Sequence, residues 1–248
     1  MDEQVVNYPI TMPWSAPLFG PPPHAWKGVR MVAFPFAPVA ETVERILPPA
    51  FEPGDGLGMI TMLSYPPGET GIHPFNELVV LVPVRLGDIE GNYVPYIYVT
   101  TDEALIAGRE IAGWPKRLAD ISWQREGTRF EGRVTRWGRP ILTLEGELQG
   151  PLPVDAAGSA AADAPTLNYK LIPGPAGEIE IEEITLTRLE MQPRDMELGS
   201  ATVSSENGPD DPLADLIPDG AGMLVAMVSD NTIPAGEVVQ RIDRRVSA

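Results

Sequence analysis

The chain contains no cysteine. Disulfide bonds, thiolate nucleophiles and cysteine-ligated metal sites are therefore excluded. It has two histidines, His24 and His73, which lie far apart and show neither HxH nor HExxH spacing, so no zinc site is expected. GxSxG, P-loop and EF-hand patterns are also missing, which argues against serine hydrolase, nucleotide-binding and calcium-binding functions.

Positive charge is scarce. Lysine and arginine total 18 against 35 acidic residues, which gives a net charge of -17. Such a surface repels phosphate polyanions, so nucleic acid is not an expected partner. Apolar runs are short and broken by proline or charge, and the first residues lack a basic region followed by an apolar one. We therefore expect no membrane partner and a cytoplasmic location.

Proline and glycine, by contrast, are abundant, with 28 and 24 residues, so long helices should not dominate. Prolines crowd residues 1–38, which predicts an extended N-terminal arm that docks through Trp14, Phe19 and Trp26. Residues 39–47 have helical spacing, and residues 101–112 form a second short helix with Thr101 as its N-cap. We expect loops at residues 154–165 and 200–211 and one domain over residues 1–248.

Most other segments carry β-strand signals. The runs are rich in Val, Ile, Tyr and Leu and are separated by turn sequences such as PPGETG and RLGDIEGN, which is typical of antiparallel strands. In residues 178–189, isoleucine and leucine alternate with glutamate, so the glutamates are expected to face water. The pattern predicts a β-rich α+β fold. The predicted strands are residues 57–63, 77–84, 93–100, 121–123, 128–137, 140–148 and 178–189.

Lysine is rare, with three residues against 15 arginines. Lys116 stands in IAGWPKRLADI, directly after the predicted helix, between Trp114 and Leu118 and beside Arg117. Apolar neighbours and a fixed cation both favour the neutral, nucleophilic form of an amine. Lys116 is therefore a candidate nucleophile, although the same spacing also suits an ordinary surface lysine with its charge in solvent.

Glu77 is the second candidate. It opens the apolar run LVVLVPV, so a carboxylate stands at the mouth of a strand that is otherwise suited to burial. A carboxyl group in such a place is suited to acid/base catalysis. A solvated glutamate at a strand end is the alternative.

The stretch EALIAGREIAGWPKRLAD resembles the signature of the acetoacetate decarboxylases and their wider superfamily. Similarity extends to residues 76–84, to NYKLIP at 168–173 and to DLIP at 215–218, and so covers essentially the whole chain. The resemblance implies a partly closed, cone-like antiparallel β-barrel with peripheral short helices, homo-oligomeric assembly, and Lys116 as a Schiff-base lysine inside the barrel. It places Glu77 at the family's acid/base position and Arg117 where the decarboxylases carry a second lysine. Activation of a lysine by a neighbouring cation is the mechanism known for acetoacetate decarboxylase.

Some positions depart from the family pattern. A second acidic residue that the decarboxylases carry falls near Thr61, in GMITMLSY, where the strand has no acidic residue. Arg30 is the nearest candidate for holding a substrate carboxylate, and Trp114 is expected to border the substrate. These departures favour Schiff-base chemistry over strict decarboxylase specificity.

The sequence thus predicts a cofactor-independent lyase, with neither cofactor nor metal, in which Lys116 condenses with a small oxo-acid. The protonated imine acts as an electron sink. One acid/base group suffices for aldol condensation of pyruvate with an aldehyde and for dehydration, so an aldolase or dehydratase is slightly preferred. A 3-oxo acid decarboxylase is the alternative, and a non-catalytic small-ligand binding protein is a further one.

Overall fold

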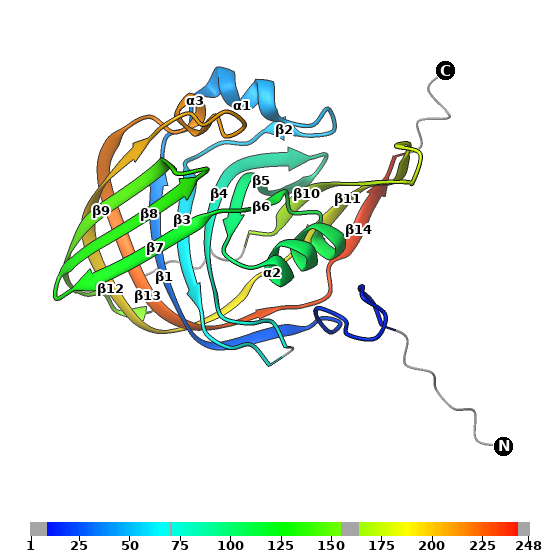
Figure 1. The fold of residues 1–248 in the computed structure, drawn as a ribbon. Helices are drawn as coiled ribbons and strands as arrows, with labels where there is room; N and C mark the ends of the chain where they lie inside the picture. Colours follow the sequence, from blue (N-terminus) through cyan, green and yellow to red (C-terminus); the bar gives the residue numbers. More distant parts are fainter. Residues whose placement is uncertain (1–8, 70, 155–163, 243–248) are drawn as a thin grey trace.

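The computed structural model describes residues 9–69, 71–154 and 164–242. It is dominated by one large, strongly curved sheet (Figure 1), whose strands follow the order β14-β11-β10-β5-β4-β3-β1-β13-β12-β9-β8-β7, with β2 added to β4 and β6 to β5. The strands are β1 His24–Phe36, β2 Glu52–Pro53, β3 Gly58–Tyr65, β4 Phe75–Leu86, β5 Ile89–Val99, β6 Lys116–Leu118, β7 Asp120–Glu126, β8 Arg129–Arg136, β9 Arg139–Pro151, β10 Thr166–Pro173, β11 Ile179–Thr187, β12 Glu190–Ser205, β13 Gly220–Ile233 and β14 Glu237–Arg241. The helices are α1 Ala40–Ile46, α2 Asp102–Ala107, the π-helical turn η1 Gly108–Ala112 and α3 Leu213–Leu216.

The predicted fold class is confirmed. Nearly all ladders are antiparallel, and parallel pairing joins β10 to β5 and β5 to β6. The sheet curls until β7 approaches β4, where Asn76 Nδ2 donates to the carbonyl of Ile121 at 3.1 Å. Between β7 and β14, the two ends of the strand order, no ladder is found within the described ranges, so the barrel is partly closed.

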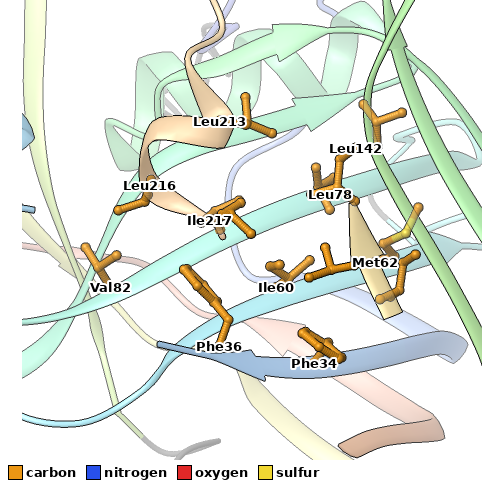
Figure 2. Close-up of a cluster of buried hydrophobic side chains, with 14 of the residues drawn as sticks. Phe34, Phe36, Ile60, Met62, Leu78, Val82, Leu142, Leu213, Leu216 and Ile217 are labelled. Atoms are coloured by element: carbon orange, nitrogen blue, oxygen red, sulfur yellow. The ribbon is translucent and has the colours of Figure 1, made fainter. Parts of the chain in front are cut away.

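The central strands β1, β3 and β4 are apolar on both faces. In β3, Ile60 and Met62 point into a close-packed cluster with residues of β1, β4, β9 and α3 (Figure 2). Met59, Thr61 and Leu63 point to the opposite face and line a cavity. Because successive side chains of a strand point to opposite faces, a single strand contributes to the solid core and to the cavity wall.

Helices lie at two places around this sheet. α1 and α3 cover the solid core together, where the Thr42 hydroxyl donates to the Asp215 carbonyl at 2.8 Å (Figure 1). α2 and η1 lie beside β5 and β6 and lead directly into Lys116. None of the helices in the described residues is both long and apolar enough to span a bilayer.

The N-terminal arm is shorter than predicted. Residues 24–36 form β1, a central strand paired with β3 and β13 rather than a docked extension. Pairing with β13 ends at Ala33, so Pro35, which has no N–H to donate, lies beyond that ladder. Phe19 and Trp26 are buried as expected, whereas Trp14 is 68% exposed.

Other local predictions also needed correction. Residues 200–205, expected in a loop, end β12, because buried Ala201, Val203 and Ser205 alternate with exposed residues. Glu183, expected in water, is buried and pairs with Lys170 at 3.2 Å. Thr101 precedes α2 but makes no side-chain cap hydrogen bond. The helix at 40–46 is confirmed, and the predicted loop at 154–165 lies largely outside the described residues.

Candidate active site

Lys116 and Glu77 meet in the interior of the molecule. Lys116 Nζ donates a hydrogen bond to Glu77 Oε2 at 2.6 Å, and the two residues are 6% and 5% exposed. Charged residues are almost never buried unless paired, so this contact is what allows both side chains to be there. The two residues that the sequence put forward separately therefore form one pair, which brings an amine and a carboxyl group into direct contact.

The backbone before Lys116 delivers its side chain to this place. The helix ends in the π-turn η1, and Gly113 then adopts a left-handed conformation with φ 75°, which favours glycine. Trp114 N donates to the Gly108 carbonyl at 3.0 Å, and β6 starts at Lys116 beside Ile97 of β5. The turn thus reverses the chain and inserts the lysine into the sheet.

Gly108 provides the space through which the lysine passes. A Cβ atom at position 108 would lie 2.5 Å from Lys116 Cδ and 2.6 Å from Cε. The glycine of the AGRE segment is therefore explained by packing against the lysine stem. Its functional value was not visible in the sequence, where glycine in a helix simply lowers helix propensity.

Aromatic rings surround the pair. Lys116 Nζ lies 5.2 Å from the Trp114 ring centroid and 5.6 Å from that of Phe75, within cation–π range. Tyr65 stacks on Phe75 at 4.4 Å. Burial first, and then the charge of Glu77, raise the pKa of Tyr65 well above its usual value, so its hydroxyl stays protonated.

His24 also borders this end of the cavity. Burial, followed by the charge of Lys116, lowers the pKa of His24, so its imidazole is neutral near pH 7. Sequence reasoning missed His24 and Tyr65 as site residues. For His24 the relevant signal is a β-bulge between Trp26 and Val29 in β1. The cavity-facing residues before the bulge, His24 and Trp26, have even numbers, and those after it, Met31 and Ala33, have odd numbers.

The pair lies in the wall of a cavity of about 810 Å³, lined by the inner faces of β1, β3, β4, β5, β12 and β13 together with α2 and η1. A cavity of this size can hold a drug-sized molecule. Trp114 is among the residues that line this cavity. Its wall near Lys116 is largely apolar, so ionic interactions there are weakly screened.

Arg117 does not accompany Lys116. It points to the opposite face of β6, where its Nη1 donates to Asp211 Oδ1 at 2.8 Å. Asp211 is completely buried and also accepts from Tyr98 at 2.9 Å and from Arg136 at 3.2 Å. Burial acts to raise the pKa of Asp211, but these hydrogen bonds outweigh it and lower that pKa below its ordinary value. Arg117 therefore neutralises a buried carboxylate rather than lying free beside the lysine, because neighbouring strand residues alternate in direction.

Arg30 is likewise directed away from the cavity. It is exposed on β1, lies 5.6 Å over the Trp123 ring, and donates to Ser64 Oγ at 3.3 Å. Its neighbour Met31 lines the cavity instead. Arg30 is thus not placed to hold a substrate carboxylate. Among the described lining residues the guanidinium group is that of Arg85, eight residues from Glu77 along β4.

No group of three or more His, Asp and Glu side chains suited to a metal ion is found in the part of the chain that the structure describes. The groups that can take part in proton transfer here are the amine of Lys116, the carboxyl group of Glu77, the phenol of Tyr65 and the imidazole of His24.

Comparison with known proteins gives consistent results. The family model described as acetoacetate decarboxylase matches residues 7–242. The chain is 24% identical over 185 residues to the acetoacetate decarboxylase of Clostridium beijerinckii, covering 74% of each chain. Among solved structures, the acetoacetate decarboxylase of Legionella pneumophila superposes with a TM-score of 0.84 at 20% identity, covering 94% of this chain and 92% of that one. The enduracididine biosynthesis enzyme MppR, complexed with the condensation product of pyruvate and imidazole 4-carboxaldehyde, gives 0.77 at 18% identity and 93% and 95% coverage.

Proposed function

Because this chain belongs to the acetoacetate decarboxylase family, we propose that it decarboxylates 3-oxo acids through a Schiff base on Lys116. The observation that carries the proposal is the buried Lys116–Glu77 contact of 2.6 Å in the cavity wall. An amine that attacks a ketone must be neutral, and the oxygen that leaves must be protonated. One proton shared between these two groups meets both needs.

Imine formation follows from this contact. With the proton on Glu77, the free amine of Lys116 attacks the ketone carbon, and Glu77 then protonates the resulting hydroxyl group. Water leaves, and the lysine nitrogen becomes a protonated imine while Glu77 becomes a carboxylate. Overall, a neutral amine, a protonated Glu77 and a ketone become an iminium ion, a Glu77 carboxylate and water, so atoms and charge balance.

Bond cleavage uses the iminium ion as an electron sink. The electron pair of the bond to the carboxylate moves into the adjacent carbon and on to the nitrogen, which gives an enamine and carbon dioxide. Glu77, now a carboxylate, takes up a proton from water, and that proton is then passed to the enamine carbon. Hydrolysis releases the methyl ketone and restores Lys116.

The surroundings of Lys116 support decarboxylation over aldol chemistry. In decarboxylation the substrate carboxylate loses its charge in the transition state, and an apolar wall beside Glu77 favours that change over the charged ground state. In aldol condensation the carboxylate of pyruvate keeps its charge throughout and needs a cationic partner. Arg30 and Arg117 both point elsewhere. These placements reverse the preference that the sequence suggested.

An aldolase or dehydratase is the second candidate. Its support is the structural likeness to MppR and the hydroxyl of Thr61 on the cavity wall, at the position where the resemblance places an acidic residue in decarboxylases. Glu77 could then serve each proton transfer in turn. A binding protein without catalysis would have the same cavity but form no imine.

Parallel assays distinguish these three functions. Acetoacetate is supplied and carbon dioxide is followed above the uncatalysed rate; separately, pyruvate and an unsaturated aldehyde are supplied and a conjugated product is followed. Decarboxylation that is absent in Lys116→Gln supports the proposal. Condensation without carbon dioxide release would establish the second candidate, and neither product together with no reducible imine would leave ligand binding.

A further inference from the structure

The cavity extends well beyond the catalytic pair as an ordered channel. Its wall consists of cross-strand rows in which β13, β1, β3 and β4 each contribute one residue. The first row is Met227–Met31–Leu63–Glu77, the second is Val225–Ala33–Thr61–Val79, and the third continues as Pro35–Met59–Leu81. Rows two residues apart are separated by about 6.6 Å, so the wall from Glu77 to Pro83 spans about 20 Å.

Beyond Glu77, the cross-strand rows of β13, β1, β3 and β4 are apolar except for Thr61. Six of the nine methionines in the chain line the cavity, namely Met31, Met59, Met191, Met196, Met223 and Met227. Methionine side chains are flexible and polarisable and adapt to apolar ligands of varied shape. The concentration of methionine on one face, while the other face of the same strands is close-packed, indicates a surface that accommodates an apolar guest.

The channel is far too large for acetoacetate alone. If each non-hydrogen atom took as much room as a water molecule, about 30 Å³, the seven such atoms of acetoacetate would occupy about a quarter of the 810 Å³. Part of the remaining space lies beside the rows from Val79 to Pro83, and part lies beside Tyr65 and Phe75 on the other side of Glu77. Ala33 and Thr61, the small residues of the second row, keep the channel wide immediately beyond the catalytic pair.

The far end of the channel reaches solvent. Leu57 and Met223 are 60% and 54% exposed there, whereas Lys116 is 6% exposed at the inner end. Exposed Asp55 and Arg85 border the same end. A substrate that enters here reaches the lysine with its reactive end inward and its other end along the rows that contain Val79 and Leu81.

We propose that the substrate is a 3-oxo acid with an extended apolar tail, which lies in this channel while its ketone meets Lys116. This inference rests on the proposed function and names its substrate class. Burial of the tail supplies binding energy that can be used at the reacting end, where the carboxylate enters an apolar region without a nearby guanidinium group. The products are carbon dioxide and a long-chain methyl ketone.

The test compares acetoacetate, 3-oxooctanoate and 3-oxododecanoate, with the uncatalysed rate subtracted. We expect kcat/KM to rise by up to about fourfold for each added methylene, which corresponds to about 0.8 kcal/mol, and to be on the order of 10²-fold higher for 3-oxooctanoate than for acetoacetate. Ala33→Phe places a ring across the second row. It should remove this preference while acetoacetate turnover persists, and that persistence shows that the variant is folded.

Two further variants complete the design. Val225→Phe narrows the same row from the neighbouring strand β13, should Ala33→Phe fail to fold. Ala176→Phe makes the same substitution as Ala33→Phe on the exposed β10–β11 turn and should change neither rate. Binding of 2-undecanone to Lys116→Gln, measured by calorimetry, reports on the channel without imine chemistry and should show a negative heat-capacity change.

The outcomes separate the two claims. A kcat/KM for acetoacetate that equals or exceeds the values for 3-oxooctanoate and 3-oxododecanoate, with no binding of 2-undecanone, would overturn the tail channel. It would leave the proposed function intact. Absence of carbon dioxide release and of a Lys116 imine with every 3-oxo acid would overturn the proposed function. In that case the binding experiment still tests the channel. Binding of 2-undecanone to Lys116→Gln that is lost in the double variant Lys116→Gln/Ala33→Phe supports the channel, and no binding to Lys116→Gln overturns it.

Discussion

The stem of Lys116 passes so close to Gly108 that a Cβ atom at position 108 would lie 2.5 Å from Lys116 Cδ. The last turn of the helix and the lysine at the start of β6 are thereby fitted to each other. This contact fixes where the amine points, toward Glu77 and the cavity. It gives the glycine a role in positioning the reactive group.

Replacing Gly108 with alanine should therefore displace the amine without unfolding the protein. A misplacement of about 1 Å can cost about 10²-fold in rate, and we expect a loss of kcat of that order. Gly220→Ala is the matched control, because Gly220 has open space where a Cβ would be and does not have a positive φ. Equal kcat values for the two variants would show that the close approach has no catalytic consequence.

Glu77→Gln should lower kcat by about 10²–10⁴-fold, since the amide keeps the shape of the side chain but cannot transfer the proton. Rapid-quench reduction should show that imine formation is slowed as well. Glu183→Gln is the control, because Glu183 is also buried against a lysine, Lys170, but does not line the cavity. A Glu77 variant as active as the Glu183 variant would remove Glu77 from the mechanism.

Arg117→Ala should leave the pH profile of Lys116 modification by an amine reagent unchanged. The reason is that the Arg117 guanidinium is paired with the buried Asp211 on the other face of β6. The sequence-based hypothesis of a neighbouring cation predicts instead that the profile moves to higher pH. Peptide mass spectrometry after partial labelling measures the profile, and a clear upward shift would restore the earlier hypothesis.

Asp211 should make stability depend on acid pH. Its folded-state pKa lies below the ordinary value of 3.8, so the stabilisation is complete above that value and is lost as the pH falls through the folded-state pKa. Asp211→Asn should cost about 3–5 kcal/mol at neutral pH, because the half-buried Arg136 loses its anionic partner in a buried ion pair. Urea unfolding from about pH 7 to about pH 3 should show a smaller difference between wild type and variant at the acid end. A difference that is independent of pH would contradict this assignment.

The fold class and the candidates Lys116 and Glu77 were predictable from the sequence. Strands such as β3, β4 and β5 were recognisable from turn chemistry and β-branched composition, whereas β10 and the central strand β13 were not predicted. The spacing around Lys116 also suited a surface lysine, and the resemblance to a family signature was what singled it out. Errors arose where small polar residues hide alternation, as in the end of β12 at residues 200–205. Proline was also misleading. Pro35 favoured an extended arm, but it lies in the central strand β1, at a point where pairing with β13 has ended and pairing with β3 continues.

The misplaced arginines have a different cause. Arg117 follows Lys116 directly in the sequence, but its side chain points to the opposite face because β6 is a strand. The direction of the Arg30 side chain depends on a bulge in β1 between Trp26 and Val29, because this bulge shifts which residues of the strand face the cavity. Neither the strand at Lys116 nor the bulge was evident from local composition, so residues adjacent in sequence were taken as neighbours in space.

The central claim is that Lys116 forms a covalent imine with the substrate, and reductive trapping tests it most directly. The protein is incubated with a 3-oxo acid and sodium borohydride, digested and read by peptide mass spectrometry, with Lys116→Gln in parallel. The account predicts a reduced ketone adduct on Lys116 in the wild type that is absent from the variant. Measurable carbon dioxide release without an adduct, or an adduct confined to Lys27 or Lys170, would contradict it.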